Sequence, residues 1–255
     1  MQSRPNSMIN KALLVFAMKE ELAPWRRGHR FLPVENSPHP VSVTSIGSTE
    51  VYVTLVGAGA VNAKHFDQLT EKIEPSLGIV TGVAAGLKPE WRPGDILVAQ
   101  TVSGSDGKPE IHADPSLLRM ALECGAKPAP LLITLPRIVR TVEEKVQLAN
   151  LGDAADMESL PLMRQWKDRA IPSLALRVIL DPVEMPMTCD FDSAMDAHGQ
   201  VRIGKLLGQI ACHPKLLPDF LHLAIQSRHV LKILAEFLDR FLSQCGAKGK
   251  EADLC

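Results

Sequence analysis

Carboxylate side chains stand where several short apolar segments of this chain end. Glu21 follows the first apolar segment, Asp181 closes the segment 174–180, and Asp156 and Glu158 come just before an amphipathic stretch. Carboxyl groups act as general acids, as general bases and as acceptors for substrate hydroxyls, and burial raises their pKa toward the neutral range that acid catalysis needs. These positions are therefore candidates for catalysis.

Each of these carboxylates also has a purely structural explanation. Glu20 and Glu21 would stabilise the N-terminus of a helix through its dipole. Asp156 has the residue type and position of a helix N-cap, and Asp181 precedes Pro182, as in a turn. Whether these carboxylates lie close together in the fold depends on how the strands and helices that carry them are arranged.

Segments rich in Val, Ile and Leu alternate with helical patterns along most of the chain. Strands are predicted at residues 12–17, 51–56, 77–83, 95–102, 131–139 and 174–180. Helices are predicted at residues 63–73, 115–124, 142–151 and 158–168. This alternation predicts an α/β fold, with a mixed, mostly parallel central sheet flanked by helices. Ligands of such sheets bind at the carboxyl ends of the strands, where we expect the carboxylates to converge.

The sequence after residue 181 predicts a long loop followed by two C-terminal helices. Residues 182–199 form a long irregular loop of the kind that often serves as a lid, and helices follow at 201–212 and 218–244. The second helix carries an apolar stripe of Phe220, Leu223, Ala224, Leu231, Leu234, Leu238 and Phe241. A helix that lies on the domain core is the favoured interpretation, and a partner or membrane surface is the alternative. We expect one domain over 12–244 and a disordered tail over 245–255.

Composition excludes several classes of function. The chain has 28 basic and 29 acidic residues, a net charge of −1 and only 4% aromatic residues, so neither duplex nor single-stranded nucleic acid is an expected partner. The five cysteines lack CxxC spacing, which favours free thiols in the cytoplasm. The first apolar segment leads into charged residues, and no segment approaches about 18 apolar residues. We therefore expect neither a signal peptide nor a membrane-spanning helix.

Residues 57–62, Gly-Ala-Gly-Ala-Val-Asn, follow a predicted strand and invite comparison with a dinucleotide-binding loop. Asn62 stands where that loop has its third glycine, and the first strand of the chain carries no such glycines. No nicotinamide or flavin cofactor is therefore expected. The sequence also lacks a Walker-type phosphate loop and zinc-finger spacing of Cys and His.

Five motifs follow one another in a fixed order. They are Ala-Met-Lys-Glu-Glu at 17–21, Val-Gly-Ala-Gly-Ala-Val-Asn at 56–62, Thr-Gly-Val-Ala-Ala-Gly-Leu-Lys-Pro at 81–89 with Pro-Gly-Asp-Ile-Leu-Val at 93–98, Asp-Met-Glu-Ser at 156–159, and Arg-Val-Ile-Leu-Asp at 177–181. This order resembles the nucleoside phosphorylase and nucleosidase superfamily over roughly residues 12–182, and is most similar to the 5′-methylthioadenosine/S-adenosylhomocysteine nucleosidases. Within the superfamily, residues 143–159 and the Pro-rich segment 214–218 resemble the branch associated with bacterial hopanoid biosynthesis.

The resemblance implies cleavage of the N-glycosidic bond of a purine nucleoside, without a metal or cofactor. Asp181 stands where the family has the acid that protonates the leaving purine at N7. Glu21 matches the carboxylate that activates water in hydrolytic members, and Glu158 matches the residue that holds the ribose hydroxyls. The other implied positions are Met157 beneath the sugar, Ala17, Val83 and Ala84 in the floor of the site, and Arg177 as a buttress.

The nucleophile and the substrate follow from the same resemblance. Phosphorylases of the superfamily bind phosphate through an arginine and a serine where this chain has Val80 and Val83, so water is the expected nucleophile and phosphorolysis is the alternative. The implied substrate is an adenosine with a 5′ substituent. In the hopanoid branch that substrate is adenosylhopane, and adenine is the released base.

Two departures from the family pattern leave other functions open. Leu180 replaces the family's serine before the catalytic aspartate, and residues 138–154 lack the segment that stacks on adenine. The alternatives are a soluble methylthioadenosine or adenosylhomocysteine nucleosidase and a nucleoside-binding protein without catalysis. A lipid-like substituent would add weak peripheral association with the inner membrane through 182–199 and the last helix. Members of the family often form homodimers, which is a further expectation.

Overall fold

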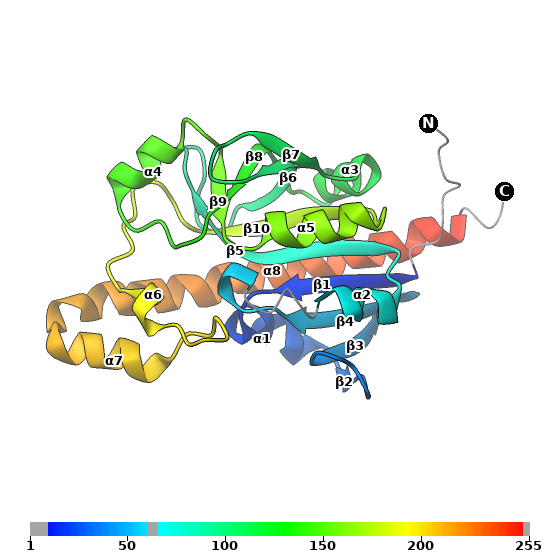
Figure 1. The fold of residues 1–255 in the computed structure, drawn as a ribbon, viewed down its shortest axis with the longest axis horizontal. Coiled ribbons are helices and arrows are strands. Elements are labelled where there is room, and N and C mark those ends of the chain that lie inside the picture. The colour runs from blue at the N-terminus through cyan, green and yellow to red at the C-terminus, as the bar shows by residue number, and fades with distance from the viewer. Residues whose placement is uncertain (1–9, 61–65, 252–255) are drawn as a thin grey trace.

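One continuous sheet of ten strands forms the centre of the computed structural model, which describes residues 10–60 and 66–251 (Figure 1). The strands are β1 (Lys11–Phe16), β2 (Leu32–Pro33), β3 (Val41–Ile46), β4 (Thr49–Leu55), β5 (Leu77–Gly86), β6 (Ile96–Ser103), β7 (Pro109–His112), β8 (Lys127–Thr134), β9 (Ala154–Asp156) and β10 (Ser173–Asp181). Parallel pairing joins β4, β1, β5 and β10, and also β6, β8 and β9. Antiparallel pairing joins β10 to β6 and β9 to β5, which closes a ring of five strands.

The predicted α/β class with a mixed sheet is confirmed, with more antiparallel pairing than the alternation of elements suggested. The additional strands are β2, β3, β7 and β9, which are short or lie beside turns and therefore give weak sequence signals. The strand expected at 131–139 begins at Lys127 and ends at Thr134. Pro128 and Pro130 obscured its start, because proline lacks the N–H that a strand ladder uses.

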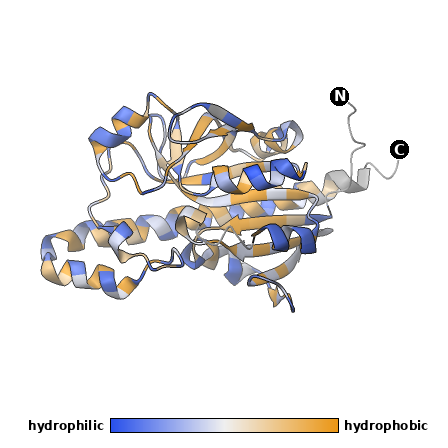
Figure 2. Ribbon diagram, in the orientation of Figure 1, coloured by the Kyte–Doolittle hydropathy of each residue, from blue (hydrophilic) through white to orange (hydrophobic). Residues whose placement is uncertain are grey.

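Helices cover both faces of the sheet. They are α1 (Lys19–Gly28), α2 (Phe66–Ile73), α3 (Pro115–Glu123), α4 (Val142–Leu148), α5 (Ser159–Asp168), α6 (Phe191–Ala194), α7 (Ile203–Cys212) and α8 (Leu217–Glu251). One apolar layer packs α1, α3 and α8 against the sheet, and a second packs α2 and α5 against the opposite face. Figure 2 shows apolar residues concentrated in the central strands between these layers.

The residues of the predicted apolar stripe on the long helix α8 lie in two different environments. Leu231, Leu234, Leu238 and Phe241 are at most 4% exposed and pack in the core, whereas the stripe residues before Leu231 face a cleft described below. The helix also continues to Glu251, so residues 245–251 are helical where a disordered tail was expected. Residues 252–255, the start of the helix expected at 63–73, and Asn62 lie outside the described ranges.

Within the described ranges, no helix combines the length and the apolar character that crossing a bilayer requires.

Candidate active site

A cleft of about 660 Å³ lies at the carboxyl ends of the parallel strands β1, β5 and β10. Seven of the eight site residues expected from the sequence line it, namely Ala17, Glu21, Val83, Ala84, Met157, Glu158 and Asp181. The eighth, Arg177, is buried behind Glu158 and contacts its carboxylate. The convergence predicted from the order of the strands is therefore present.

A gap in strand pairing along β5 creates room for the site. On one edge of β5, β1 pairs with residues 77–80 and β9 pairs with Ala85 and Gly86. Residues 81–84 of β5 lie between these two partners. On this edge, no strand in the described part of the chain pairs with residues 81–84. The backbone N–H of Val83 is consequently available to a side chain, and it donates to Glu21.

Glu21 is held by three backbone donors. Its Oε2 accepts hydrogen bonds from the N–H groups of Ala17 and Met18, each at 3.0 Å, and its Oε1 accepts one from Val83 at 2.9 Å. Because Glu21 is the third residue of α1, its bond to the Met18 N–H also caps the helix, and its place in the first turn agrees with the predicted interaction with the helix dipole. Burial raises the pKa of Glu21, while the charge of Arg177 and the three N–H donors lower it.

Gly82 makes the approach of Glu21 to β5 possible. Its φ of +142° lies in a region that residues with a side chain rarely adopt. A Cβ at this position would overlap Glu21 Oε1 and would lie 2.9 Å from Arg177 Nη1. The glycine in the predicted Thr-Gly-Val-Ala-Ala motif is therefore required by the packing of two charged side chains against the backbone.

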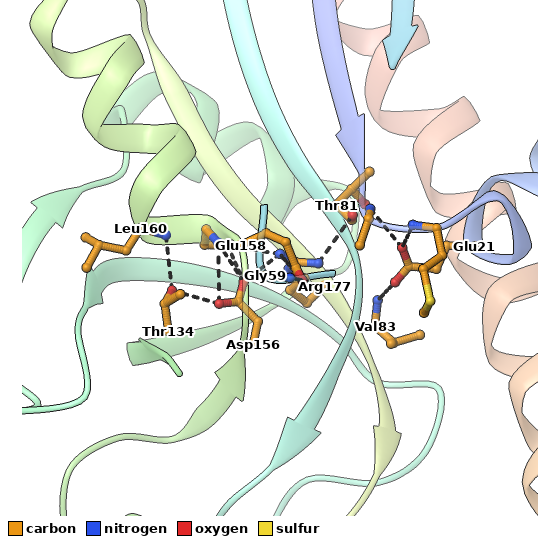
Figure 3. A network of polar contacts seen from close by, with 12 residues as sticks. Glu21, Gly59, Thr81, Val83, Thr134, Asp156, Glu158, Leu160 and Arg177 are labelled. Carbon is orange, nitrogen blue, oxygen red and sulfur yellow. Dashed lines mark hydrogen bonds and ion pairs between the residues drawn. The ribbon is translucent and has the colours of Figure 1, made fainter. Parts of the chain in front are cut away.

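Arg177 joins the carboxylates of Asp156 and Glu158 into one buried network (Figure 3). Its Nη2 lies 2.6 Å from Asp156 Oδ2 and 3.2 Å from Glu158 Oε2, and its Nη1 donates to the Thr81 carbonyl oxygen. Asp156 also accepts from the backbone N–H of Ser159 and from the Thr134 hydroxyl. Asp156 is not the N-cap residue expected from the sequence, since Glu158 occupies that position, but it accepts from the N–H of Ser159, the first residue of α5, and also supports Arg177.

Glu158 presents its carboxyl group to the cleft from the end of β9. Its Oε1 accepts from the Gly59 N–H at 2.9 Å. Burial raises the pKa of Glu158 to about 7; Arg177 opposes this rise, and the negative charges of Asp156 and Glu21 add to it. A carboxylate that titrates near neutral pH can accept hydroxyl hydrogen bonds in its ionised form.

Asp181 ends β10 on the other side of the cleft and pairs with Lys145, which sequence reasoning did not identify as a site residue. Lys145 Nζ lies 2.6 Å from Asp181 Oδ2, and the two side chains are 0% and 5% exposed. Burial raises the pKa of Asp181 to about 6, although the charge and hydrogen bond of Lys145 lower it. A buried carboxyl with this pKa can hold a proton close to neutral pH and deliver it to a substrate.

The cleft extends beyond the carboxylates into an apolar arm. The arm is formed by the segment after β10, by α7 and by the start of α8, through Met187, Phe191, Met195, Val201, Ile203, Leu206, Phe220, Leu221, Leu223 and Ala224. The predicted loop 182–199 contains the short helix α6, and its end is tied down where Gly199 accepts a hydrogen bond from the Ala58 N–H. Whether this segment moves as a lid stays a prediction.

No group of three or more His, Cys, Asp or Glu side chains arranged to hold a metal ion occurs among the residues that the structure describes.

Comparison with known families agrees with the geometry. The family model described as "Phosphorylase superfamily" matches residues 11–211, which include every strand and all eight site residues expected from the sequence. The chain belongs to the phosphorylase superfamily. A comparison with curated protein sequences finds no match.

Solved structures of nucleosidases share the fold of this phosphorylase superfamily member. The 5′-methylthioadenosine/S-adenosylhomocysteine nucleosidase of Campylobacter jejuni has 18% sequence identity and a TM-score of 0.69, over 92% of this chain and 99% of that one. Futalosine hydrolase of Helicobacter pylori has 16% identity and a TM-score of 0.71, over 92% and 98% of the two chains. The Neisseria meningitidis 5′-methylthioadenosine/S-adenosylhomocysteine nucleosidase in complex with methylthio-immucillin-A has 16% identity and a TM-score of 0.64, also over 92% and 98%.

The positions at which this superfamily's phosphorylases are expected to bind phosphate have other roles here. Val80 is 1% exposed and packs in the apolar layer beneath the sheet. Val83 lines the cleft, but its N–H is already donated to Glu21. The cations that line the cleft in the described part of the chain are Arg27, Arg137 and Arg228, all of them exposed.

The two departures from the superfamily pattern lie in the wall of the cleft. Leu180 lines it, and the Leu180 carbonyl oxygen accepts a hydrogen bond from Gln226 of α8. After β8 the chain turns into the cleft and lines it with Leu135, Ile138 and Val139. Within the segment 138–154, which lacks the superfamily's adenine-stacking residues, the aliphatic side chains of Ile138 and Val139 therefore line the cleft.

Proposed function

We propose that this protein hydrolyses the N-glycosidic bond of a purine nucleoside that carries an apolar 5′ substituent. The observation that carries the proposal is the pairing of two features in one cleft: buried carboxyl groups at the strand ends, and an apolar arm that continues away from them. Carboxyl groups supply the acid and base that glycosidic hydrolysis needs, and the arm offers room for an apolar group.

The proposed mechanism assigns one task to each carboxyl group. Asp181 donates its proton to N7 of the purine as the bond between C1′ and N9 breaks, which lets the base leave without a full negative charge. Glu21 takes a proton from the water whose oxygen attacks C1′. Glu158, when ionised, accepts hydrogen bonds from ribose hydroxyls and stabilises positive charge on the sugar ring. Met157, Ala17, Val83 and Ala84 shape the floor, and Arg177 holds Glu158 in place.

The apolar arm favours adenosylhopane over smaller substrates. Its wall of methionine, phenylalanine and leucine side chains would remove a rigid hydrocarbon from water, with a gain of about 25 cal/mol per Å² of apolar surface. A soluble methylthioadenosine or adenosylhomocysteine nucleosidase is the second candidate, because the fold is shared with such enzymes. The amino-acid group of adenosylhomocysteine would place charges against this apolar wall, which is unfavourable unless they are paired.

A panel of 5′-substituted adenosines tests the function and its nucleophile. We expect adenine release to increase with the size of an apolar 5′ group, and to be the same with and without phosphate, because Val80 and Val83 donate nothing to an anion from their side chains. Free adenine is measured by chromatography, and the sugar product by mass spectrometry.

Each alternative gives a different result in this panel. A ribose 1-phosphate product would establish phosphorolysis and would direct attention to Arg137 and Arg228 as phosphate ligands. A preference for methylthioadenosine over every bulky group would favour the soluble nucleosidase. Nucleoside binding without adenine release would identify a binding protein that lacks catalysis.

We further propose that the arm opens toward a membrane surface. Ile203, Leu207, Leu217, Leu221 and Ile225 on α7 and the start of α8 are 44–69% exposed, and Ile203 and Leu221 also line the cleft. Figure 1 shows these helices extending from one end of the molecule. An exposed apolar face that is continuous with an apolar cleft suits weak, reversible contact with lipid.

Vesicle flotation at low salt tests this contact. Wild-type protein is expected to rise with vesicles of phosphatidylethanolamine and phosphatidylglycerol, and the double variant Leu217→Ser, Ile225→Ser to remain below, since these residues are exposed but do not line the cleft. Leu32→Ser is the matched control, because Leu32 is 52% exposed on β2. Wild-type protein that stays with the unbound fraction would contradict the proposal. The homodimer and the cytoplasmic location stay predictions.

A further inference from the structure

Lys145 lies behind the proposed general acid and outside the cleft. It is fully buried, while Asp181, its ion-pair partner, lines the cleft. Lys145 Nζ also donates to the carbonyl oxygens of Pro182 at 2.9 Å and Met185 at 2.7 Å. One buried ammonium group therefore fixes the Asp181 carboxylate and the first residues of the segment that leaves β10.

Burial of a lysine at this position needs a reason beyond packing. Removing a charge from water is unfavourable by several kcal/mol even after relaxation, and an ion pair offsets this only with good geometry and further hydrogen bonds. Both conditions are met here. The ammonium engages Asp181 Oδ2, which leaves the orientation of Oδ1 fixed by the planarity of the carboxyl group.

We propose that Lys145 is the positioning residue of the general acid: it orients Asp181 toward the purine and stabilises the carboxylate that remains after proton transfer. This inference rests on the proposed function. When the proton moves from Asp181 to N7 and the C1′–N9 bond breaks, the new negative charge forms beside an ammonium group that is already in place. No reorganisation of solvent is needed at that moment, which is the advantage of a preorganised charge.

A comparison of the charged groups near Asp181 supports this role for Lys145. Lys145 of α4 is the charged side chain in contact with it. The other charged groups that share the cleft come from α1, from the end of β9, from the segment after β8 and from α8, and are Glu20, Glu21, Arg27, Asp156, Glu158, Arg137 and Arg228. None of these is an ion-pair or hydrogen-bond partner of Asp181 in the described residues.

The test compares the pH dependence of kcat/KM for wild type, Lys145→Met and Lys145→Arg. Loss of the neighbouring positive charge raises the pKa of a carboxyl group by about 1–3 units, so in Lys145→Met the fall in activity at high pH should move upward by that amount. The maximal kcat should fall on the order of 10-fold, because the acid becomes weaker and less well oriented. Lys145→Arg keeps the positive charge, so in this variant the fall in activity at high pH should occur at the same pH as in wild type.

Controls separate positioning from general stability. Lys88→Met removes the cation of another pair with a buried partner, Lys88 with Asp153, which lies outside the cleft; its pH profile should match wild type even if its melting temperature falls. In an Asp181→Asn background, Lys145→Met should change kcat little, because the partner through which it acts is gone. A Lys145→Met profile that superimposes on wild type, with only a lower melting temperature, would overturn the proposal.

A measurement without turnover distinguishes this inference from the proposed function. The ¹³C shift of the Asp181 carboxyl carbon, assigned with Asp181→Asn, should titrate at higher pH in Lys145→Met than in wild type. If wild-type protein releases no base, the proposed function fails, whereas an unchanged titration would refute the effect of Lys145 on Asp181. If Lys145→Met does not fold, Lys145→Gln removes the charge and keeps a hydrogen-bond donor for the same comparison.

Discussion

Replacement of Asp181 by asparagine is expected to lower kcat about 10²–10⁴-fold, the usual contribution of a positioned general acid. Asparagine keeps the size of the side chain but has no proton of suitable acidity for the purine. The variant is also expected to be less stable, by about 3–5 kcal/mol, because it leaves the Lys145 ammonium buried without its counter-charge. Kinetics should therefore be measured below the melting temperature of the variant, where it is fully folded.

The pH profile gives an independent test of this assignment. Asp181, with its pKa raised to about 6, carries a proton below that pH and loses it above, so the fraction of enzyme with a protonated Asp181 should fall as the pH rises through 6. Glu158, with its pKa raised to about 7, must be ionised to accept ribose hydroxyls, so the fraction of enzyme with an ionised Glu158 should fall as the pH drops below 7. Together they predict a bell-shaped profile with its maximum between these values.

In Asp181→Asn only the rise near pH 7 should remain, because the group responsible for the other limb is absent. Near-normal turnover in the variant, or a descending limb that persists unchanged, would show that another group protonates the base. Asp153→Asn is a matched control, since Asp153 is a second buried aspartate in an ion pair with a lysine but lies away from the cleft.

The sequence predicted the site because its residues lie at strand ends. Glu21 follows β1, Val83 lies near the end of β5 and Asp181 ends β10, and parallel strands with clear apolar signals bring such positions together. The fold class followed from the same alternation of elements. Gly82, which the motif included without a stated role, is explained by the tertiary structure: its φ is +142°, and Glu21 and Arg177 occupy the space that a Cβ would need.

Lys145 and the apolar arm could not be predicted in the same way. Lys145 lies 36 residues from its partner, and it is one of three charged residues in α4, so nothing in the local sequence marks it as buried beside Asp181. The arm depends on the placement of α7 and the start of α8 over the segment after β10. The spacing of apolar residues on α8 indicated a buried face. It did not indicate that this face lines the cleft before Leu231 and packs in the core after it.

Replacement of Glu21 by glutamine is expected to lower kcat about as much as the loss of Asp181, by about 10²–10⁴-fold, with little change in the affinity for a non-hydrolysable nucleoside analogue. The amide cannot take a proton from water. It also places an NH₂ group where a carboxylate oxygen accepts from backbone N–H groups, so a buried donor loses its acceptor, which lowers stability by about 1–3 kcal/mol. Single-turnover rates and calorimetric binding measure the two effects separately.

Glu20→Gln is the matched control for this variant. Glu20 lies one residue away on α1 and also lines the cleft, but its side chain is 43% exposed. Its neutralisation should leave kcat within a few-fold of wild type. Equal losses in the two variants would point to the general negative charge of the cleft instead of a base at one position. A large loss in Glu21→Gln alone, with binding retained, would assign proton removal to Glu21, because the three N–H donors aimed at its oxygens favour the ionised form that a base requires.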